Sequence, residues 1–397
     1  KKSKNIGLQN KNLLSLSYGK IKNKDFNTSF GLLPASFETY QIVNNGNIIL
    51  RLTDLQNDKK SLRVGLVTQT GIITSAYLCL EFRNWMNPFF SYYLLHTYDI
   101  SKVFYWYGGG LRSTMKFDDI KVLPFLTPPL HEQKAIANYL DTKTAQFDRK
   151  IDLLTQKAIQ YGKLKQSLIN ETVTRGLDKT VAMKYSGVEW IGEVPEHWEI
   201  NRIKEVSIVV NGATPKSSVA ENWDGELSWV TTDDLGKLNT KFITDTKRKI
   251  TEKGYASCGA TICPVGSVVI SGRAPIGHIG ILSIKASSNQ GCKTLVLNHK
   301  VTNNLYIYYS LLSSKSKLEA LGRGTTFIEL STKELGLFNL PMPSLAEQKA
   351  ITDYLDTKTA HIDSIIETIN TQIDKLKELR KTLINDVVTG KIKVAQS

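Results

Sequence analysis

A long internal repeat constrains the fold of this chain more than any other feature of its sequence. The segment LHEQKAIANYLDTKTAQFD begins at Leu130, and a close copy, LAEQKAITDYLDTKTAHID, begins 215 residues later at Leu345. This period is far longer than the periods of solenoid repeats, so it indicates a duplication. The residues upstream of the two copies differ from each other, and the chain therefore has the order variable, shared, variable, shared.

Both shared segments are expected to form long helices. Each follows a proline-containing stretch, TPPL or PMPSL, and proline suits the first turn of a helix. Apolar residues then recur mainly at steps of three and four residues, which predicts one narrow apolar seam on each helix. The seam consists of Leu140, Phe147, Ile151, Leu154, Ala158, Tyr161 and Leu168 in the first segment, and of Leu355, Ile362, Ile366, Ile369, Ile373, Leu376, Leu383 and Val387 in the second. A helix of about 40 residues spans ~60 Å. Two such helices packed antiparallel would form a rigid spacer, although each seam could instead be the core face of its own domain.

The variable segments alternate short β-like runs with helical runs, as mixed domains do. Expected strands include NIILRL from Asn47, IKEVSIVV from Ile203 and GSVVISG from Gly266, and the run from Asn304 to Gly322 is expected to be helical. The sequence therefore predicts an α+β fold, in which two mixed α/β domains are separated by two long helices packed as an antiparallel coiled-coil-like pair with a pseudo-twofold repeat. The expected divisions are a first domain at 1–128, the first shared helix at 129–176, a linker at 177–199, a second domain at 200–343, the second shared helix at 344–390 and a tail at 391–397.

The linker VAMKYSGVEWIGEVPEHWEI, from Val181 to Ile200, is expected to lie over the surface of the second half. A counterpart of its Pro195 before the first domain would precede residue 1. The chain starts at Lys1 rather than at methionine, so we expect an incomplete N-terminus.

Charge and composition narrow the class of protein. Lys and Arg number 51 against 37 Asp and Glu, a formal net charge of +14, which makes a polyanion the first partner to consider. Four cysteines in 397 residues are too few for a disulfide framework, and the first residues lack the apolar run of a signal peptide. No stretch approaches the ~20 apolar residues of a membrane span. We therefore expect a cytoplasmic protein without a membrane partner.

No motif in the sequence predicts catalysis. The string NPFF at 87–90 comes nearest to the aromatic-capped double-proline motif of amino-methyltransferases, but it lacks the second proline and is expected to be a loop. The glycine groups at 108–110 and 322–324 follow apparent helices rather than strands, unlike dinucleotide-binding loops. Cys258, Cys263 and Cys292 lack the two close pairs of a zinc site and are expected to be buried thiols. We expect no catalytic residue, metal or cofactor on this chain.

Several strings taken together point to one family. They are the paired LxEQxxI and YLDxKT openings at Leu130 and Leu345, VEWIGEVPEHWEI from Val188, WVTTDDL from Trp229, SGRAPIG from Ser271, SSNQG from Ser287, and in the first half LSLSYGKI from Leu14, GLLPASFETYQIV from Gly31, RLTDLQND from Arg51 and GIITSAYL from Gly71. On these motifs, which cover nearly the whole chain, the sequence resembles the specificity subunit of Type I restriction-modification systems.

The resemblance implies a non-catalytic subunit that reads double-stranded DNA, with two target-recognition domains that each read one half of a bipartite site. It also implies partners. Two modification (methyltransferase) subunits, which carry S-adenosylmethionine, would dock against the helices and domains, and restriction (translocase-nuclease) subunits would join that core. The helix length would set the gap between half-sites, which for major-groove readers is about one helical turn, ~34 Å.

Candidate DNA contacts are basic, amide and hydroxyl side chains on loops, because such groups bind phosphates and base edges. In the first domain they are Lys59, Lys60, Arg63, Trp106, Tyr107, Gly109, Arg112 and Ser113, and in the second they are Lys216, Ser217, Thr231, Thr232, Arg273, Asn289, Gln290, Arg323, Thr325 and Thr326. Each could equally be a solvated loop residue. Arg112 and Arg323 are the leading candidates, because each lies in a glycine-rich loop that leaves room for a bidentate contact with guanine.

Two other classes of function remain open. A structural adaptor with a helix pair and a basic surface would bind any duplex with a steep salt dependence and without sequence preference. A self-sufficient methyltransferase or nuclease would need motifs that the sequence lacks. The sequence specifies neither the half-sites nor whether the surrounding system cuts DNA or only methylates it.

Overall fold

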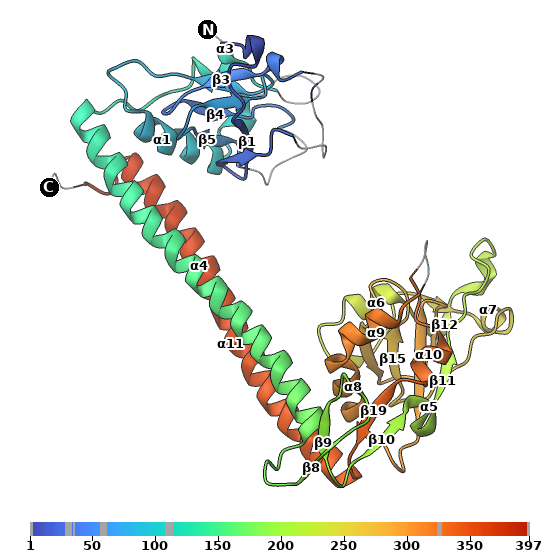
Figure 1. Cartoon of the computed structure of the whole chain (residues 1–397). Coiled ribbons are helices and arrows are strands. Elements are labelled where there is room, and N and C mark those ends of the chain that lie inside the picture. The colour runs from blue at the N-terminus through green and yellow to red at the C-terminus, as the bar shows by residue number, and fades with distance from the viewer. Residues whose placement is uncertain are drawn as a thin grey trace. The chain divides into compact units, whose positions relative to one another are not determined.

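The computed structural model describes residues 3–27, 34, 36–55, 62–107, 114–323 and 328–394. The chain divides into two compact units (Figure 1). The first unit is Lys1–Gln156 with Ile369–Ser397, and the second is Lys157–Thr368. The division passes through both long helices, so each unit contains one part of each helix and is described by itself. Among the described residues, no helix is both long and apolar enough to cross a membrane.

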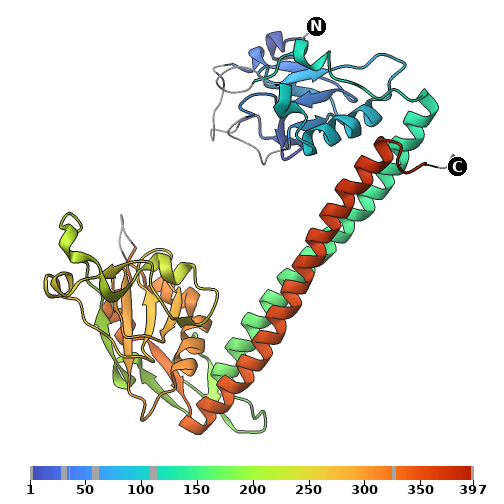
Figure 2. The ribbon, with the colours of Figure 1, turned by 180° about the vertical axis from the view of Figure 1, so that it is seen from behind.

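The two shared segments form long helices, as predicted. Helix α4 (Leu130–Arg175) and helix α11 (Leu345–Val388) lie side by side in both views (Figures 1 and 2). None of the predicted seam residues is exposed. Ion pairs join the helices in each unit, between Arg380 Nε and Asp148 Oδ1 at 3.1 Å in the first and between Lys165 Nζ and Asp363 Oδ2 at 2.6 Å in the second.

The ends of the long helices also belong to the cores of the two domains. In the first unit, Leu140 and Ile384 share a buried cluster with Phe90 of the adjoining domain. In the second, Ile169 and Leu355 belong to the large core of that domain. Both sequence interpretations of the seams therefore hold, with helix against helix along the shafts and helix against domain at the ends.

Among the described residues of the first unit there are two small sheets. One has the order β2-β1-β6-β3 and the other β5-β4-β7. The strands are β1 (Leu13–Ser17), β2 (Lys20–Lys24), β3 (Gln41–Val43), β4 (Ile48–Leu50), β5 (Val64–Leu66), β6 (Gly71–Ile73) and β7 (Leu78–Leu80), and the helices are η1 (Ile6–Leu8), η2 (Phe37–Thr39), α1 (Pro88–Ile100), α2 (Phe104–Tyr107) and α3 (Phe117–Ile120). The NPFF string is not a loop, because Asn87 Oδ1 accepts hydrogen bonds from the Phe89 and Phe90 amides and caps α1.

The second unit is built on a five-stranded mixed sheet of order β11-β18-β15-β16-β13. In the part of this unit that the structure describes, three smaller sheets, β14-β12-β17, β10-β19 and β8-β9, accompany it. The strands are β8 (Met183–Tyr185), β9 (Glu193–Pro195), β10 (Glu199–Arg202), β11 (Ser207–Asn211), β12 (Trp223–Val230), β13 (Phe242–Ile243), β14 (Lys249–Ile250), β15 (Val268–Ser271), β16 (Ile279–Leu282), β17 (Ser287–Ser288), β18 (Cys292–Leu297) and β19 (Asn339–Met342). The helices are α5 (Ile203–Val206), η3 (Ala220–Asn222), α6 (Thr232–Gly236), α7 (Glu252–Ala256), α8 (Asn304–Ser313), α9 (Lys315–Leu321) and α10 (Thr332–Gly336).

Two expectations for the second domain were wrong. The run IKEVSIVV is not one strand, because its first half forms α5, where the Glu205 carboxylate accepts a hydrogen bond from the Arg202 amide at 2.7 Å. The linker does not simply cover the surface. Its Val194 and Trp198 are buried in the core with Ile169 of α4, because the segment pairs into strands that pack against the end of that helix.

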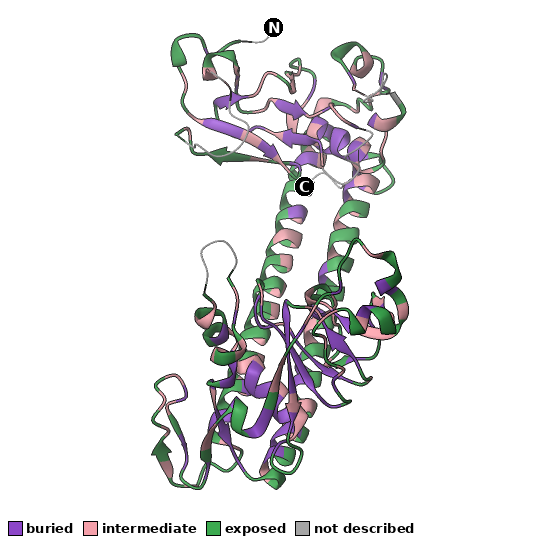
Figure 3. Cartoon of the chain, turned by 90° about the vertical axis from the view of Figure 1, so that its right-hand side faces the viewer, coloured by how far each residue is buried: buried purple, intermediate pink, exposed green. Residues whose placement is uncertain are grey.

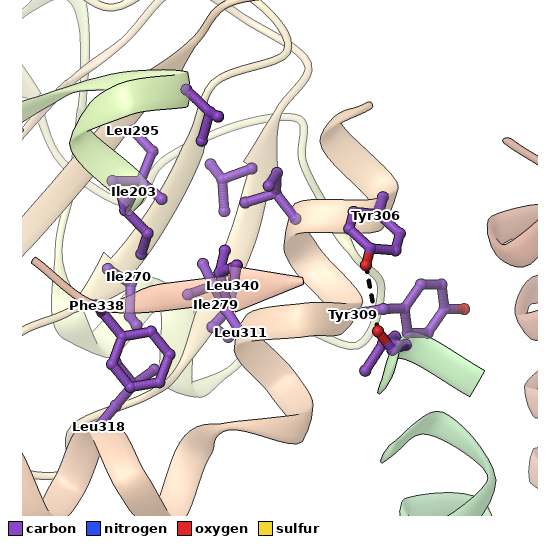
Figure 4. Close-up of a cluster of buried hydrophobic side chains, with 14 of the residues drawn as sticks. Ile203, Ile270, Ile279, Leu295, Tyr306, Tyr309, Leu311, Leu318, Phe338 and Leu340 are labelled. Atoms are coloured by element: carbon purple, nitrogen blue, oxygen red, sulfur yellow. Dashed lines mark hydrogen bonds between the residues drawn. The ribbon is translucent and has the colours of Figure 1, made fainter. Parts of the chain in front are cut away.

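The core of the second unit lies between the main sheet and α8. Ile270 and Leu295 of the sheet pack with Leu311 of α8, and Tyr306 and Tyr309 project from the same helix (Figure 4). Strands of this sheet are largely buried, whereas the long helices carry exposed faces (Figure 3). Cys263 and Cys292 are buried thiols of a neighbouring cluster, while Cys258 is half-buried.

The duplication extends further than the sequence repeat suggested. In each unit a buried glutamine near the start of the long helix binds the N-cap of a domain helix: Gln133 Oε1 accepts from the Asn87 amide at 2.7 Å, and Gln348 Oε1 accepts from the Asn303 amide at 2.8 Å. Both glutamines also donate to a proline carbonyl just before their own helix. Helices α1 and α8 are therefore counterparts that attach each domain to its long helix.

A tyrosine contact repeats in the same way. The Tyr93 hydroxyl donates to Asp141 at 2.6 Å in the first unit, and the Tyr309 hydroxyl donates to Asp356 at 2.6 Å in the second. Each hydroxyl also lies 3.2 Å from a threonine hydroxyl of the long helix. Burial raises the pKa of both tyrosines, so the hydroxyls remain donors at any ordinary pH.

Removing either hydroxyl should weaken the attachment of domain to helix. We expect Tyr309→Phe to destabilise the second unit, and Tyr93→Phe the first, each by about 1 kcal/mol for the lost hydrogen bonds. Urea unfolding of the full chain measures both changes. Equal stability of wild type and both variants would show that these contacts contribute nothing to the attachment.

Candidate nucleic-acid interface

Loops gather at one end of the main sheet in the second unit. Strand β11 ends at Asn211 opposite Lys293, and β15 ends at Ser271 opposite Cys292, the first residue of β18. Beside them β12 ends at Val230, which pairs with Ser288 of β17. The residues that follow β11, β15, β12 and β17 therefore emerge together. We call this set, residues 211–217, 230–232, 271–277 and 288–293, the loop end.

Close backbone contacts fix the loop end. The Ala213 amide donates to the Ser288 carbonyl at 2.9 Å, and a Cβ on Gly212 would lie 1.8 Å from the carbonyl oxygen of Asn289, so only glycine fits there. The Thr214 hydroxyl donates to the Gln290 side chain across the same gap. These contacts give the two loops a defined relative position, which direct contacts with base edges require.

The structure brings together several residues predicted from the sequence. Around Gly291, a Cβ would lie 3.1 Å from Thr232 Cγ2, 3.3 Å from Asn289 Oδ1 and 3.7 Å from Arg273 Cδ. Thr232, Asn289 and Arg273, which are far apart in the sequence, are thus neighbours at the loop end. Gln290 is exposed beside them.

A network of charged side chains holds Arg273 in place at the loop end. Glu329 accepts hydrogen bonds from Arg273 Nε at 3.0 Å and from Lys293 Nζ at 2.9 Å, and the lysine also donates to Asn211 Oδ1 at 2.6 Å. The Lys293 side chain is only 3% exposed. Burial alone would raise the pKa of Glu329, but the hydrogen bonds from Lys293 and Arg273 outweigh it and hold that pKa below its ordinary value.

Arg273 is oriented by this network. Only its Nε donates to Glu329, and its terminal nitrogens have no hydrogen bond to any part of the chain that the structure describes. The pair of terminal N–H groups is the part of arginine that binds guanine or phosphate in a bidentate manner.

Arg323 has a similar arrangement in a more open position. Its Nε pairs with Glu334 Oε1 at 2.8 Å, while its side chain is 83% exposed. Its backbone forms a bridge with Glu329, so it is tied to the same network. Thr325 and Thr326 lie outside the described residues.

The remaining predicted residues of the second domain divide by environment. Lys216 and Ser217 are exposed on the loop that follows β11. Thr231 caps α6, and its hydroxyl accepts from the Asp234 amide and donates to the Asp234 carboxylate, so the hydroxyl is already used within the protein.

In the first domain the structure describes few of the predicted residues. Lys59, Lys60, Gly109, Arg112, Ser113 and the Tyr107 side chain lie outside the described part of the chain. Trp106 is 83% exposed on α2.

Arg63 is not at a surface, contrary to the prediction. It is fully buried, and its guanidinium donates to the Arg51, Thr53 and Asp54 carbonyls and to the Tyr105 hydroxyl. These bonds satisfy a buried cation within the domain, so we leave Arg63 out of the proposed DNA contacts.

Sequence reasoning missed three parts of this site. Lys293 and Glu329 were not singled out, because Lys293 lies in the strand-like run KTLVL and nothing in the sequence marks its burial. Arg248, whose Cζ lies 3.7 Å from the ring centroid of Trp223, was also missed, although the run Lys247, Arg248, Lys249 was a visible basic signal.

The chain matches known proteins along most of its length. Residues 195–375 match the family model described as the Type I restriction modification DNA specificity domain. The Type I restriction enzyme MjaIX specificity subunit of Methanocaldococcus jannaschii is 32% identical over 199 residues, which are 49% of this chain and 45% of that protein. The MjaVIII specificity subunit of the same organism is 26% identical over 364 residues, 89% of this chain and 81% of that one.

A solved structure has the same fold. A chain from a study of complex assembly and conformational transition of the type I R-M system superposes with a TM-score of 0.70 at 18% identity, covering 93% of this chain and 87% of that chain. This chain spans less than half of the MjaIX subunit but most of the MjaVIII subunit and of the solved chain. Together with the duplicated helices and the sequence motifs, these matches show what the chain is similar to: the specificity subunits of type I restriction-modification systems, whose DNA specificity domain is matched by residues 195–375.

Proposed function

We propose that this chain selects the DNA sequence on which a type I restriction-modification complex acts. Each domain reads one half of a bipartite double-stranded site, and the chain itself performs no chemistry. Two methyltransferase subunits, which supply S-adenosylmethionine, dock on the helices and domains, and translocase-nuclease subunits join them. The similarity to type I specificity subunits supports this proposal, and so does the duplicated architecture, because two related domains suit two half-sites.

The observation on this chain's own residues that most supports the proposal is the grouping of polar side chains at the loop end. At the loop end, the guanidinium of Arg273 and the amides of Asn289 and Gln290 lie beside one another on loops fixed by short backbone contacts. Arginine with guanine and amides with adenine are the most frequent direct contacts in the major groove. The loop end therefore has the donors and acceptors that base reading needs.

The adaptor alternative rests on the net charge of +14, which favours binding to any duplex. The anchored arginines favour sequence reading instead. A protein that only neutralises phosphates has no need for Arg273 and Arg323 to be oriented by carboxylates, which also reduce its net positive charge.

Selection from random duplexes distinguishes the two. The complex of the full chain with its methyltransferase partner is incubated with a pool of random duplexes near 0.15 M salt, and the retained duplexes are sequenced. We expect enrichment of two short motifs separated by a fixed gap. Retention without any enriched motif, together with a steep salt dependence, would favour the adaptor.

Arg323 provides a residue-level test of the same proposal. Arg323→Ala should relax the preference at one base pair of one half-site, with a loss of discrimination of roughly tenfold, as expected for one bidentate contact. The same selection measures it. Arg202→Ala is the matched control, because it removes an arginine that pairs with Glu205 and is the last residue of β10, outside the loop end. An unchanged motif in Arg323→Ala would exclude the base contact.

A further inference from the structure

We propose that Arg248 is a phosphate-binding residue of the second unit, stacked on the buried Trp223 and close to the buried Trp229 beside the loop end, so that its N–H edge faces the backbone of the DNA half-site. This inference deepens the proposed function and rests on it. It concerns a residue on the segment between β13 and β14, outside the loops that the sequence singled out.

The stack itself is well defined. The Arg248 Cζ lies 3.7 Å from the ring centroid of Trp223 and 5.6 Å from that of Trp229. The two indoles meet edge to face, with centroids 5.1 Å apart and planes at 74°, and both are buried while Arg248 is exposed. Stacking on an indole restricts the guanidinium plane and leaves its N–H groups pointing outward in that plane.

The same tryptophans support the loop end. Trp229 Nε1 donates to the Ala213 carbonyl at 2.9 Å, in the loop that carries Lys216. The Trp229 amide donates to Thr246 Oγ1 at 3.2 Å, and that hydroxyl donates to the Arg248 carbonyl at 2.8 Å. Trp229 therefore joins the segment of Arg248, through its backbone amide, to a loop of the loop end, through its indole.

The charge around Arg248 indicates which part of DNA it binds. Arg273 and Arg323 each pair with a carboxylate through Nε, whereas Arg248 has no ion pair among the residues that the structure describes. It is flanked by exposed Lys247 and by Lys249, which pairs with Asp245 at 3.6 Å. The Arg248 guanidinium lies beside other cations and has no carboxylate partner among the described residues, so it can bind an external anion such as a DNA phosphate. A run of basic residues is also typical of contacts with the DNA backbone rather than with base edges.

The test compares two duplexes at several salt concentrations. The complex of the full chain with its methyltransferase partner binds either a duplex carrying the motif selected above or an unrelated duplex. For Arg248→Ala we expect an affinity roughly tenfold lower on both duplexes, because one charge-assisted contact is lost. We also expect the slope of log K against log salt to become shallower by about 0.9, with the selected motif unchanged. Arg248→Lys should keep the slope and recover only part of the affinity, because an ammonium cannot stack or bind in a bidentate manner.

Arg202→Ala is again the matched control and should change affinity by less than about twofold. Equal affinity and slope for wild type and Arg248→Ala would overturn the inference. A loss confined to the selected duplex, with an altered motif, would also overturn it, because Arg248 would then read a base. Failure of the proposed function would give a different result: the wild-type complex itself would bind the two duplexes with equal affinity. That outcome does not depend on Arg248. Thermal unfolding of each variant, which should match wild type for an exposed arginine, confirms that the fold is intact.

Discussion

Replacing Glu329 by alanine is expected to destabilise the second unit by about 3 to 5 kcal/mol, the cost of leaving a buried charge without its partner. The Lys293 ammonium would keep only the Asn211 side chain as a hydrogen-bond partner, and that amide oxygen carries no net charge. Arg273 would lose the carboxylate that orients it, so the second half-site should be read less selectively as well.

Urea unfolding of the full chain measures the stability change. Glu221→Ala is the matched control, because Glu221 pairs with Lys253 at the surface and its loss should leave the free energy of unfolding close to that of wild type. The double variant Lys293→Met with Glu329→Leu removes the buried ammonium together with its carboxylate partner and should recover much of the stability. Similar losses for Glu329→Ala and Glu221→Ala would contradict this account of the network.

The pH dependence of this contribution follows from the lowered pKa of Glu329. Because the pKa is lower in the folded state than the ordinary value of 4.5, the network contributes its full stability above pH 4.5. This contribution to stability decreases as the pH falls through the lower pKa that Glu329 has in the folded state. Glu329→Gln should therefore lose less stability on acidification than wild type over this range.

Replacing Trp198 by alanine should cost the second unit about 3 to 5 kcal/mol, because it removes a large side chain from a packed core. Trp198 is 1% exposed, and its Nε1 donates to Glu347 Oε1 at 3.2 Å at the start of α11. Its ring also lies against Gly176, just beyond α4, where a Cβ would be 3.1 Å from the indole. The side chain thus packs between the ends of both long helices.

Trp106→Ala provides the control for Trp198→Ala, since Trp106 is exposed and its removal should change stability by no more than about 0.5 kcal/mol. Trp198→Phe should fall between wild type and alanine. Thermal or urea unfolding separates these cases. If Trp198→Ala lowers the free energy of unfolding by less than about 1 kcal/mol, the linker is not an integral part of the core. The linker would then lie over the surface, as expected from the sequence.

The long helices could be predicted almost to the residue, because two signals coincide there. The repeat marks the segments, and the proline before each seam marks where the helix begins; the helices are Leu130–Arg175 and Leu345–Val388. A run such as Ile203–Val210 has neither signal. Its apolar residues suit a helical turn and a strand equally well, and only tertiary packing decides that α5 precedes β11.

The relation between the two domains was hidden for a different reason. Helices α1 and α8 make matching contacts through Asn87 and Asn303, yet their sequences share little beyond an asparagine cap and aromatic residues. Packing against a long helix requires an N-cap, a buried tyrosine hydroxyl and apolar bulk, and many sequences satisfy those requirements. The residues that make the matching contacts are therefore the same in both units, whereas most residues around them differ.

The candidate site was predicted in outline only. Arg273, Asn289 and Gln290 were chosen as polar loop residues, and the fold places them together because the ends of β15 and β18 are adjacent. Burial could not be predicted in the same way. Arg63 and Lys293 are both basic residues next to β-like runs, and both are buried, which the local sequence does not distinguish from exposure. The partners that neutralise them come from distant parts of the chain.

The central claim is that this chain determines which DNA sequence its complex recognises. Mapping methylated adenines in DNA from cells that express the methyltransferase partner with and without this chain tests it most directly. We predict a split motif, two short half-sites with a fixed gap, that appears only when this chain is present. An assembled complex that adds no motif, or a motif that is already present without this chain, would contradict the claim.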